Sequence, residues 1–380
     1  MELFFGIILG LIILVFLVVS HELGHAIVAH RNGVAVEEFG IGLPPRAWKK
    51  KLKNGVLFSL NWLPLGGFVK LQGEYDSANK KGDYGAASFI KKTKILLAGV
   101  TINWLLAAVI FTILSLVGLP KALPDQVTIP GATTIISQPV EIISLTEGYP
   151  AQQAGLIVGD KITKFAGQEV STVSRLIELT KENRGQLTDV MYVRNGVSYD
   201  IQVTIGDNPN GGYLGANLGQ RESIKASFWA APALGVATTA QFSVVTLQGV
   251  GDLIGNLARG VISQFSSDAN VREQASSDLN TVSEGVAGPI GILGTIFPAA
   301  QRAGLTQLLF LTGIISLSLA VMNILPIPAL DGGRWLVMTI FRLTKKDLTK
   351  EREEKIQTIG FLILMSLVVL VTFVDVSKLL

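Results

Sequence analysis

The feature that most constrains this chain is a set of four long stretches with hardly any charge. They run from Leu3 to Ala29, Ile95 to Leu119, Leu305 to Leu330 and Ile359 to Val374. About 20 mostly apolar residues are enough to cross the hydrocarbon core of a bilayer as a helix. The composition agrees, because 49% of the 380 residues are hydrophobic and only 16% are charged. We predict a polytopic α-helical membrane protein with about four transmembrane helices.

A fifth stretch, Ala226 to Val250, also lacks charge. It contains three glycine or proline interruptions in all, Pro232 among them, and Ser, Thr and Gln at many positions. We interpret it as a helix that lies in the membrane interface or packs against protein, and not as a span.

Basic residues in the connecting segments indicate how the spans are oriented. The segment Arg31 to Lys94 holds 12 Lys or Arg residues against five acidic ones, and Asp331 to Lys355 holds seven more. Short cytoplasmic loops are enriched in Lys and Arg. Both segments are therefore predicted to be cytoplasmic, and Pro120 to Gly304 extracytoplasmic. The first stretch lacks the basic start of a signal peptide, so we expect it to be retained. Nothing in the composition suggests nucleic-acid binding.

The first apolar stretch ends in the sequence HELGH. Four residues separate His21 from His25, so on a helix both imidazoles lie on one face and can bind one zinc ion. In an H-E-x-x-H motif the glutamate, here Glu22, acts as the general base on water activated by zinc. The alternative is a set of interfacial polar residues, but ionisable groups in a span are costly and usually functional. His30, beside Arg31, is interpreted as interfacial.

The segment NILPIPALDGGR, Asn323 to Arg334, offers a third metal ligand. Its two prolines exclude a regular helix, and Gly332 and Gly333 are expected to allow unusual backbone angles. Irregular backbone at membrane depth is tolerated only where it lines a protein cavity. Asp331 in such a cavity is a candidate ligand; the alternative is a helix N-cap or turn residue outside the membrane. With no cysteine in the chain, any metal must be held by imidazole, carboxylate or carbonyl groups.

The number of spans decides whether these ligands can meet. With four spans, the first and third run in the same direction, so His21, His25 and Asp331 all lie toward the cytoplasmic side. A fifth span at Ala226 to Val250 would move Asp331 to the opposite face. A single shared metal site therefore favours the interfacial interpretation of that segment.

Several motifs in this order resemble those of the site-2 protease family of intramembrane zinc metalloproteases. The resemblance is closest to the bacterial regulator-of-sigma-E protease branch and extends over nearly the whole chain. It rests on HELGH, GIGLPP (Gly40 to Pro45), LPLGGFVKLQGE (Leu63 to Glu74), GPIGI (Gly288 to Ile292) and NILPIPALDGG.

The resemblance implies a role for each of these residues. His21, His25 and Asp331 carry over as Zn²⁺ ligands and Glu22 as the catalytic base. Asn323 carries over as a residue that hydrogen-bonds the substrate backbone or the developing oxyanion, although helix packing is an alternative. The implied substrates are single-pass membrane proteins already cut once, such as anti-sigma factors or signal-peptide remnants. The implied location is the bacterial cytoplasmic membrane, with the active site toward the cytoplasm.

The resemblance also implies two β-regions. The first cytoplasmic loop is expected to form a membrane-reentrant β-structure with turns at Pro64 and Gly66-Gly67, whose exposed edge pairs with an unwound substrate. An amphiphilic hairpin that only anchors the loop is the alternative.

The segment Val140 to Val170 resembles one bacterial PDZ domain, followed by a hairpin over Asn195-Gly196. This extracytoplasmic α+β domain either binds a peptide or protein or acts as a steric filter.

These assignments divide the chain into eight segments. They are a first transmembrane helix (1–30), a cytoplasmic β-region (31–93), a second helix (94–119), the PDZ domain (120–207), a linker with interfacial helices (208–304), a third helix (305–334), a cytoplasmic loop (335–355) and a fourth helix (356–380). A competing hypothesis from another class is a non-proteolytic, membrane-anchored PDZ adaptor with a structural metal site.

Overall fold

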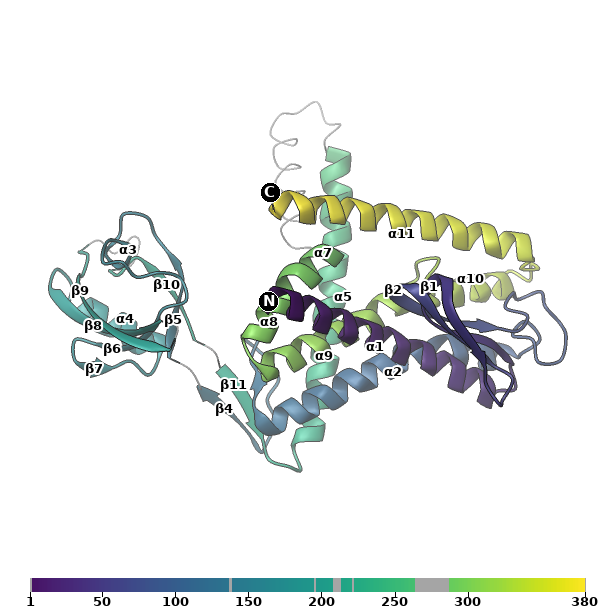
Figure 1. The fold of residues 1–380 in the computed structure, drawn as a ribbon, viewed down its shortest axis with the longest axis horizontal. Helices are drawn as coiled ribbons and strands as arrows, with labels where there is room; N and C mark the ends of the chain where they lie inside the picture. The colour runs from purple at the N-terminus through teal and green to yellow at the C-terminus, as the bar shows by residue number, and fades with distance from the viewer. Residues whose placement is uncertain are drawn as a thin grey trace. The chain divides into compact units, whose positions relative to one another are not determined.

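The computed structural model describes residues 2–136, 139–194, 196–207, 213–220, 222–263 and 287–379 (Figure 1). The chain divides into two compact units. One unit, Met1–Leu114 with Pro232–Leu380, is built mainly of long helices, and the other, Ser115–Ala231, is built mainly of strands. Parts of the predicted linker, residues 208–212, 221 and 264–286, lie outside the described residues.

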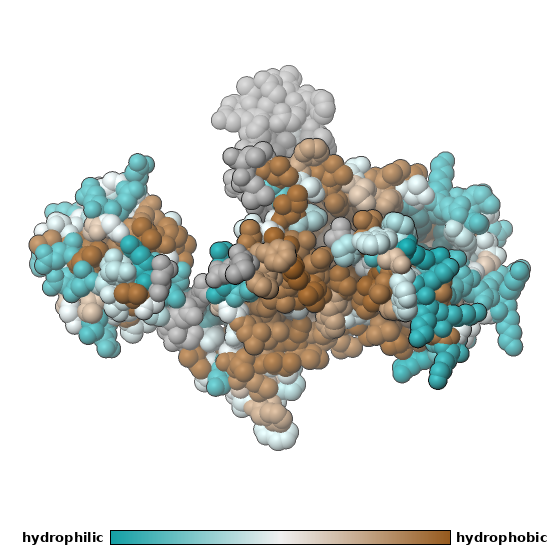
Figure 2. Space-filling view, viewed as in Figure 1, coloured by the Kyte–Doolittle hydropathy of each residue, from teal (hydrophilic) through white to brown (hydrophobic). Residues whose placement is uncertain are grey.

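The helical unit contains most of the apolar sequence. Its elements are α1 (Glu2–Arg31), β1 (Val36–Lys51), β2 (Leu57–Leu71), α2 (Phe89–Val117), α5 (Ala231–Ser263), α7 (Pro289–Gly291), the π-helix η2 (Ile292–Ile296), α8 (Phe297–Arg302), α9 (Leu305–Ile324), α10 (Asp331–Leu343) and α11 (Lys350–Leu379). Figure 2 shows hydrophobic residues over the helices and hydrophilic residues where β1 and β2 extend beyond them.

Five described helices are long and apolar enough to cross a membrane. Four of them, α1, α2, α9 and α11, correspond to the four predicted spans. The fifth is α5, which covers most of the segment interpreted as interfacial and is the least apolar of the five. In Figure 1, α5 runs across the direction of α1, α2 and α11. It packs on α2 and α9 through Phe242, whose ring contacts Phe111 and Phe310. Four spans stay our prediction.

The direction of the helices brings the two basic segments together. In Figure 1, α1 ends, and α2 and α11 begin, at the same end of the helical unit, where β1 and β2 also lie. The start of α1 and the end of α11 lie at the other end. The basic segment between α1 and α2 and the basic start of α11 therefore lie at the same end of the helical unit.

The strands β1 and β2 form a sheet that is wider than two simple strands. Phe39 of β1 is paired with both Val69 and Phe58 of β2, and residues 46–51 pair with 57–61. The order across the sheet is 67–71, 36–41, 57–60 and 46–51. The chain reverses direction between residues 60 and 67, because 57–60 and 67–71 lie on opposite sides of 36–41 and run in opposite directions. Gly66, at φ +99°, lies in this reversal, where the sequence predicted turns at Pro64 and Gly66-Gly67.

The second unit is a small antiparallel sheet with two helices. Its elements are β3 (Leu119–Pro120), β4 (Ala132–Ile136), β5 (Val140–Leu145), α3 (Pro150–Gln153), β6 (Lys161–Phe165), β7 (Gln168–Glu169), α4 (Val173–Glu182), β8 (Leu187–Arg194), β9 (Val197–Thr204), β10 (Ala216–Gly219) and β11 (Glu222–Ala226).

The larger sheet of this unit has the order β10-β5-β6-β8-β9 around an apolar core, and β3, β11 and β4 form a second sheet. The short helix α3 and the β8–β9 hairpin lie where the sequence predicted them, with Asn195 of the turn outside the described residues. The larger sheet also includes β10, which lies beyond residue 207, the predicted end of the PDZ domain.

Candidate metal centre

The histidines of HELGH lie in the last third of α1, on one face of the helix. Both are buried, with 7% of His21 and 8% of His25 exposed. Their Nε2 atoms lie 3.1 Å apart. Helical spacing of four residues accounts for this convergence, because positions i and i+4 are neighbours on a helix surface.

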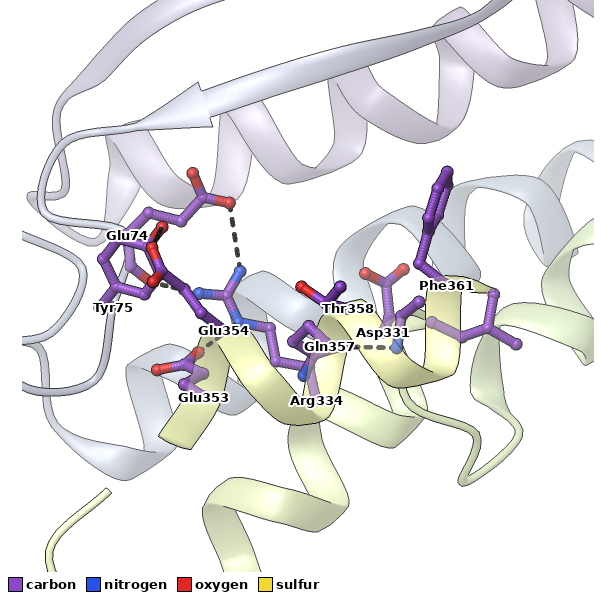
Figure 3. Close-up of a pocket in the computed structure, with 11 residues that line it drawn as sticks. Glu74, Tyr75, Asp331, Arg334, Glu353, Glu354, Gln357, Thr358 and Phe361 are labelled. Atoms are coloured by element: carbon purple, nitrogen blue, oxygen red, sulfur yellow. Dashed lines mark hydrogen bonds and ion pairs between the residues drawn. The ribbon is translucent and has the colours of Figure 1, made fainter. Parts of the chain in front are cut away.

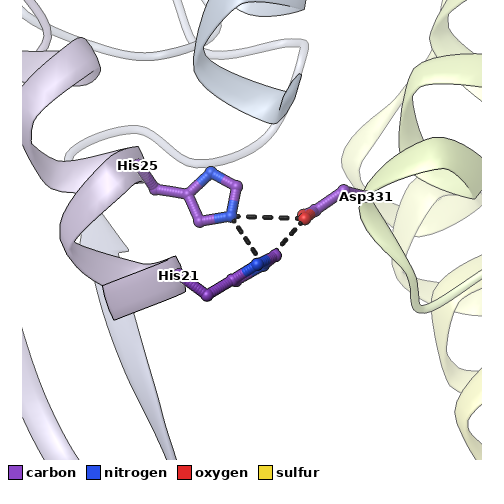
Figure 4. A group of neighbouring side chains, drawn as sticks. All are labelled: His21, His25 and Asp331. Carbon is purple, nitrogen blue, oxygen red and sulfur yellow. Dashed lines mark hydrogen bonds and ion pairs between the residues drawn. The ribbon is translucent and has the colours of Figure 1, made fainter. Parts of the chain in front are cut away.

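Asp331 comes from the opposite end of the sequence and reaches the same point. It is the first residue of α10, after an irregular segment, 325–330, that holds the two prolines. Its Oδ2 lies 3.1 Å from His21 Nε2 and 3.2 Å from His25 Nε2 (Figure 4). The predicted alternative, an N-cap, does not describe it: the N-cap is Leu330, and the carboxylate contacts the imidazoles.

The two glycines after Asp331 have a different role from the expected one. Neither Gly332 nor Gly333 has a positive φ; both lie within α10. A Cβ on Gly333 would come within 1.9 Å of the Ile327 carbonyl oxygen, so only glycine allows α10 to pack this closely on the segment before it. The unusual backbone angle belongs to Ala329, at φ 77°.

The three side chains fit a zinc ion. Their donor atoms lie within 4.8 Å of one another, and ligands about 2.0–2.1 Å from a tetrahedral zinc lie about 3.3 Å apart. The Nδ1 of His25 donates to the Ile95 carbonyl oxygen at 2.7 Å, which leaves its Nε2 lone pair for a metal. The Nδ1 of His21 is buried without a partner. Two nitrogens and one oxygen leave a fourth position for water or substrate.

Room for the imidazoles is provided by α2. A Cβ on Gly99 would lie 2.5 Å from His25 Nε2 and 2.6 Å from His21 Nε2. Any larger side chain must displace both rings, because real Cβ atoms do not approach so closely. Gly99 and the Ile95 carbonyl were not identified from the sequence as parts of the site. A glycine one turn after Ile95 in a predicted span is the only signal that could have indicated them.

Glu22 follows His21 by one residue, which places it about 100° around α1 from His21. It is half-buried and lies against β2, where a Cβ on Gly67 would be 3.6 Å from Glu22 Cγ. Its carboxylate interacts electrostatically with His25, His21 and Asp331. Glu22 thus lies between the candidate metal ligands and the 67–71 edge of the sheet.

Two asparagines of the helical unit, Asn323 in α9 and Asn103 in α2, are polar residues in apolar segments. The Nδ2 of Asn323, in the last turn of α9, donates to the Leu319 carbonyl oxygen at 2.9 Å, so its amide is bonded within its own helix. Asn103, one turn after Gly99, is fully buried, and neither atom of its side-chain amide has a hydrogen-bond partner.

A polar cavity of about 480 Å³ opens onto Asp331 (Figure 3). It is lined by Glu74, Tyr75, Ala329, Leu330, Asp331, Arg334, Glu353, Glu354, Gln357, Thr358 and Phe361. These residues come from the segment after β2, from the start of α10 and from α11. The charged and polar side chains of this cavity therefore lie on the side of the candidate metal site that Asp331 occupies.

Arg334, one turn after Asp331 in α10, connects the segments that line this cavity. Its Nε donates to Glu353 Oε1 of α11 at 3.1 Å, its Nη2 donates to the Glu74 carbonyl oxygen, and its guanidinium stacks on Tyr84 at 4.9 Å. These contacts fix the start of α10. Its spacing of three residues from Asp331 is the signal in the sequence that places it on the same side of the helix.

Comparisons with known proteins agree with this site. Residues 9–367 match the model of peptidase family M50. A Clostridium perfringens protein named as a zinc metalloprotease is 30% identical over 363 residues, covering 95% of each chain. The regulator of sigma-W protease RasP of Bacillus subtilis is 25% identical over 446 residues, covering 96% of each chain. The solved structure of a PDZ domain from Listeria monocytogenes matches 22% of this chain and 90% of its own length at 18% identity. Its TM-score of 0.20 is too low to indicate a shared fold.

The apolar helices define a multi-pass membrane protein, and the site has a candidate ligand set for a zinc ion. The chain belongs to peptidase family M50. It is a zinc metalloprotease, its cofactor is zinc, and the expected site-2 protease family is confirmed.

Proposed function

We propose that this protein hydrolyses peptide bonds within or near the transmembrane segments of single-pass membrane proteins after a first cut. The observation that carries the proposal is the meeting of two imidazoles and a carboxylate in the apolar helical unit, with Glu22 beside them. Anti-sigma factors and signal-peptide remnants are the substrate classes that the family resemblance favours.

The residues of the site have separate roles in the proposed reaction. His21, His25 and Asp331 hold zinc, which when bound polarises the scissile carbonyl and acidifies water. Glu22 takes a proton from the attacking water and passes it to the leaving nitrogen. Burial of the ligands excludes other water, while the cavity beside Asp331 admits the water that reacts.

The 67–71 edge of β2 is suited to holding the substrate. In the part of the chain that the structure describes, no further strand pairs with this edge, and Gly67 faces Glu22. A peptide bond in a helix is protected by its own hydrogen bonds. Pairing with a free strand edge extends the substrate beside the catalytic base.

Asn323 is proposed to contact the substrate or the developing oxyanion. Its Nδ2 must then leave the Leu319 carbonyl, which is a single-residue rearrangement at the end of α9.

The basic segments that hold β1, β2 and α10 are proposed to face the bacterial cytoplasm. The second unit then lies outside, as a single PDZ-type domain that binds a peptide or excludes substrates whose outer domain is intact.

The proposal is tested with the purified full-length chain in proteoliposomes and a panel of membrane-spanning peptides. Mass spectrometry of the products maps each cut. We expect cuts within or next to the apolar segment, loss of cleavage after zinc removal by a chelator, and recovery on adding Zn²⁺. Cleavage that persists in the chelated protein, or cuts confined to soluble loops, would contradict the proposal.

The second candidate, a membrane-anchored PDZ adaptor with a structural metal site, makes a different prediction. A structural site has no use for a glutamate next to its first ligand. Glu22→Gln should leave an adaptor unchanged in every respect, whereas it should abolish proteolysis in the enzyme.

A further inference from the structure

A second cavity lies on the side of α1 away from the metal ligands. It has a volume of about 430 Å³ and lies between the end of α1 and the sheet. Its lining is almost entirely apolar and comprises Leu23, Ala26, Ile27, Val36, Phe39, Leu52, Val56 and Phe58, with His30, Arg31 and Asn54 as the polar members. Apolar cavities of this size with a few polar groups are typical of small-molecule sites.

The position of this groove on α1 separates it from the catalytic site. Leu23 and Ile27 each follow a metal ligand by two residues, which turns them about 200° around the helix. Their exposed fractions are 46% and 38%, against 7% for His21 and 8% for His25. A substrate held at the metal ligands cannot fill the groove.

The floor of the groove is aromatic. The rings of Phe39 and Phe58 are stacked at 6.3 Å with an angle of 12° between them. Lys50 is paired with Phe58 across the strands, so its side chain projects on the same face of the sheet.

The charges at the groove are uncompensated and positive. In the described parts of the chain neither Arg31 nor Lys50 forms an ion pair, and the same holds for Lys49, Lys51 and Lys53. The two acidic residues of β1 are already neutralised, Glu37 by Lys70 and Glu38 by Arg46. An anion at the mouth of the groove therefore meets basic residues without competition.

We propose that this groove binds one anionic phospholipid. The acyl chain lies along Leu23, Ile27 and the stacked phenylalanines, and the phosphate lies at Arg31 and Lys50. An apolar groove with a basic mouth at the end of a transmembrane helix has the complementarity that such a lipid requires. The third histidine, His30, lies at the same mouth, where the zinc site does not use it.

Native mass spectrometry of the full-length chain in detergent tests the proposal. Phosphatidylglycerol and phosphatidylcholine with identical acyl chains are added in separate titrations. We expect one tightly bound phosphatidylglycerol per chain, with affinity roughly tenfold or more above that for phosphatidylcholine, from about fivefold for each of two basic residues. Equal affinity for the two lipids, or a second copy of the chain bound in place of lipid, would overturn the proposal.

Two variants separate the groove from a general attraction of lipids to basic residues. Arg31→Gln with Lys50→Gln should remove the preference for phosphatidylglycerol, while the matched control Lys80→Gln with Lys81→Gln, two exposed lysines elsewhere, should keep it. Val56→Trp fills the groove without changing charge and should abolish binding of both lipids; Ala26→Leu does the same from α1 if Val56→Trp fails to fold. Full phosphatidylglycerol binding in the filled variants, with zinc content unchanged, contradicts a groove-bound lipid.

Discussion

The buried carboxylate of Asp160 in the second unit and the cluster of His21, His25 and Asp331 in the helical unit differ in how their polar groups are paired. In the second unit, Asp160 is fully buried, and it accepts hydrogen bonds from Arg194 Nε and Nη2 at 2.7 Å each and from the Ile157 backbone N–H at 2.8 Å. In the helical unit, the Nδ1 of His21 and the amide of Asn103 are buried without partners. Three side chains there that could hold a metal ion converge on one point.

This difference in pairing distinguishes buried polar groups that stabilise the fold from those that serve a function. Buried polar groups in folded proteins are nearly always hydrogen-bonded, and a buried charge is tolerated when it is paired. Asp160 follows this rule, and its partner lies 34 residues away in the same small sheet. The His21, His25 and Asp331 cluster joins residues 310 positions apart, and the Nδ1 of His21 has no hydrogen-bond partner. A buried charge that is paired, such as that of Asp160, stabilises the unit that contains it. Buried polar groups that have no partner indicate where a unit binds a ligand.

The largest effect is expected from Asp331→Asn. Loss of the carboxylate removes one of three donors, so zinc affinity should fall by more than the roughly 10–100-fold typical of groups one shell further out. Zinc content after dialysis and proteolysis should be lost together. Glu354→Gln, in the same cavity but outside the donor group, is the control and should keep its zinc. Equal zinc content in both variants would remove Asp331 from the site.

Gly99→Ala tests whether α2 packs so closely on the two imidazoles that only glycine fits at this position. The new Cβ would push on both imidazoles, so we expect zinc affinity to fall by about 10–100-fold while the protein still folds. The matched control is Gly251→Ala in α5, where a Cβ meets nothing within 4 Å. Unchanged zinc affinity in the Gly99 variant, measured by competition with a chelator, would contradict the packing described.

Asp160→Asn should destabilise the second unit and leave the stability of the helical unit unchanged. Removing one partner of a buried ion pair costs about 3–5 kcal/mol, and partial exposure of Arg194 reduces the expected loss to about 2–3 kcal/mol. Calorimetry should show a lower unfolding temperature for the transition of this unit, with zinc content unchanged. The control Asp189→Asn removes an exposed carboxylate and should have almost no effect. Loss of zinc in the Asp160 variant would show that the units are not independent.

The smallest effect concerns Glu38, a compensated charge in the helical unit. The hydrogen bond from Arg46 lowers its pKa below the usual 4.5. The stability that Glu38 contributes is therefore present above about pH 4.5 and is lost as the pH falls through the lowered value. Because Arg46 is half exposed, we expect less than about 1 kcal/mol. Protection factors of the β1 amides, which are corrected for the intrinsic slowing of exchange at low pH, should fall below pH 4.5 in the natural chain, and Glu38→Gln should remove this pH dependence; the same dependence in both would exclude Glu38 as its source.

The sequence predicted those parts of the molecule that follow from short-range pattern. Apolar length predicted α1, α2, α9 and α11, and four-residue spacing predicted that His21 and His25 share a face. The requirement for one metal site brought Asp331 to them. The ligand roles themselves stay predictions, as does that of Asn323.

Features that depend on long-range packing were not predictable. The need for Gly99 arises from two imidazoles on another helix, and the need for Gly333 from the Ile327 carbonyl that α10 packs against. Neither contact leaves a periodic signal in the sequence. The turn at Pro64 and Gly66-Gly67 was predictable from local sequence, but the position of 36–41 between the two halves of β2 was not.

The central claim is that one zinc ion is held by α1 and α10 beside a catalytic glutamate. Its most direct test compares the natural chain with Glu22→Gln in the same proteoliposomes, with zinc per chain and cleavage of a transmembrane peptide measured side by side. We predict one zinc per chain in both proteins and cleavage only in the natural one. Equal cleavage by both would contradict the mechanism, and absence of zinc from both would contradict the site.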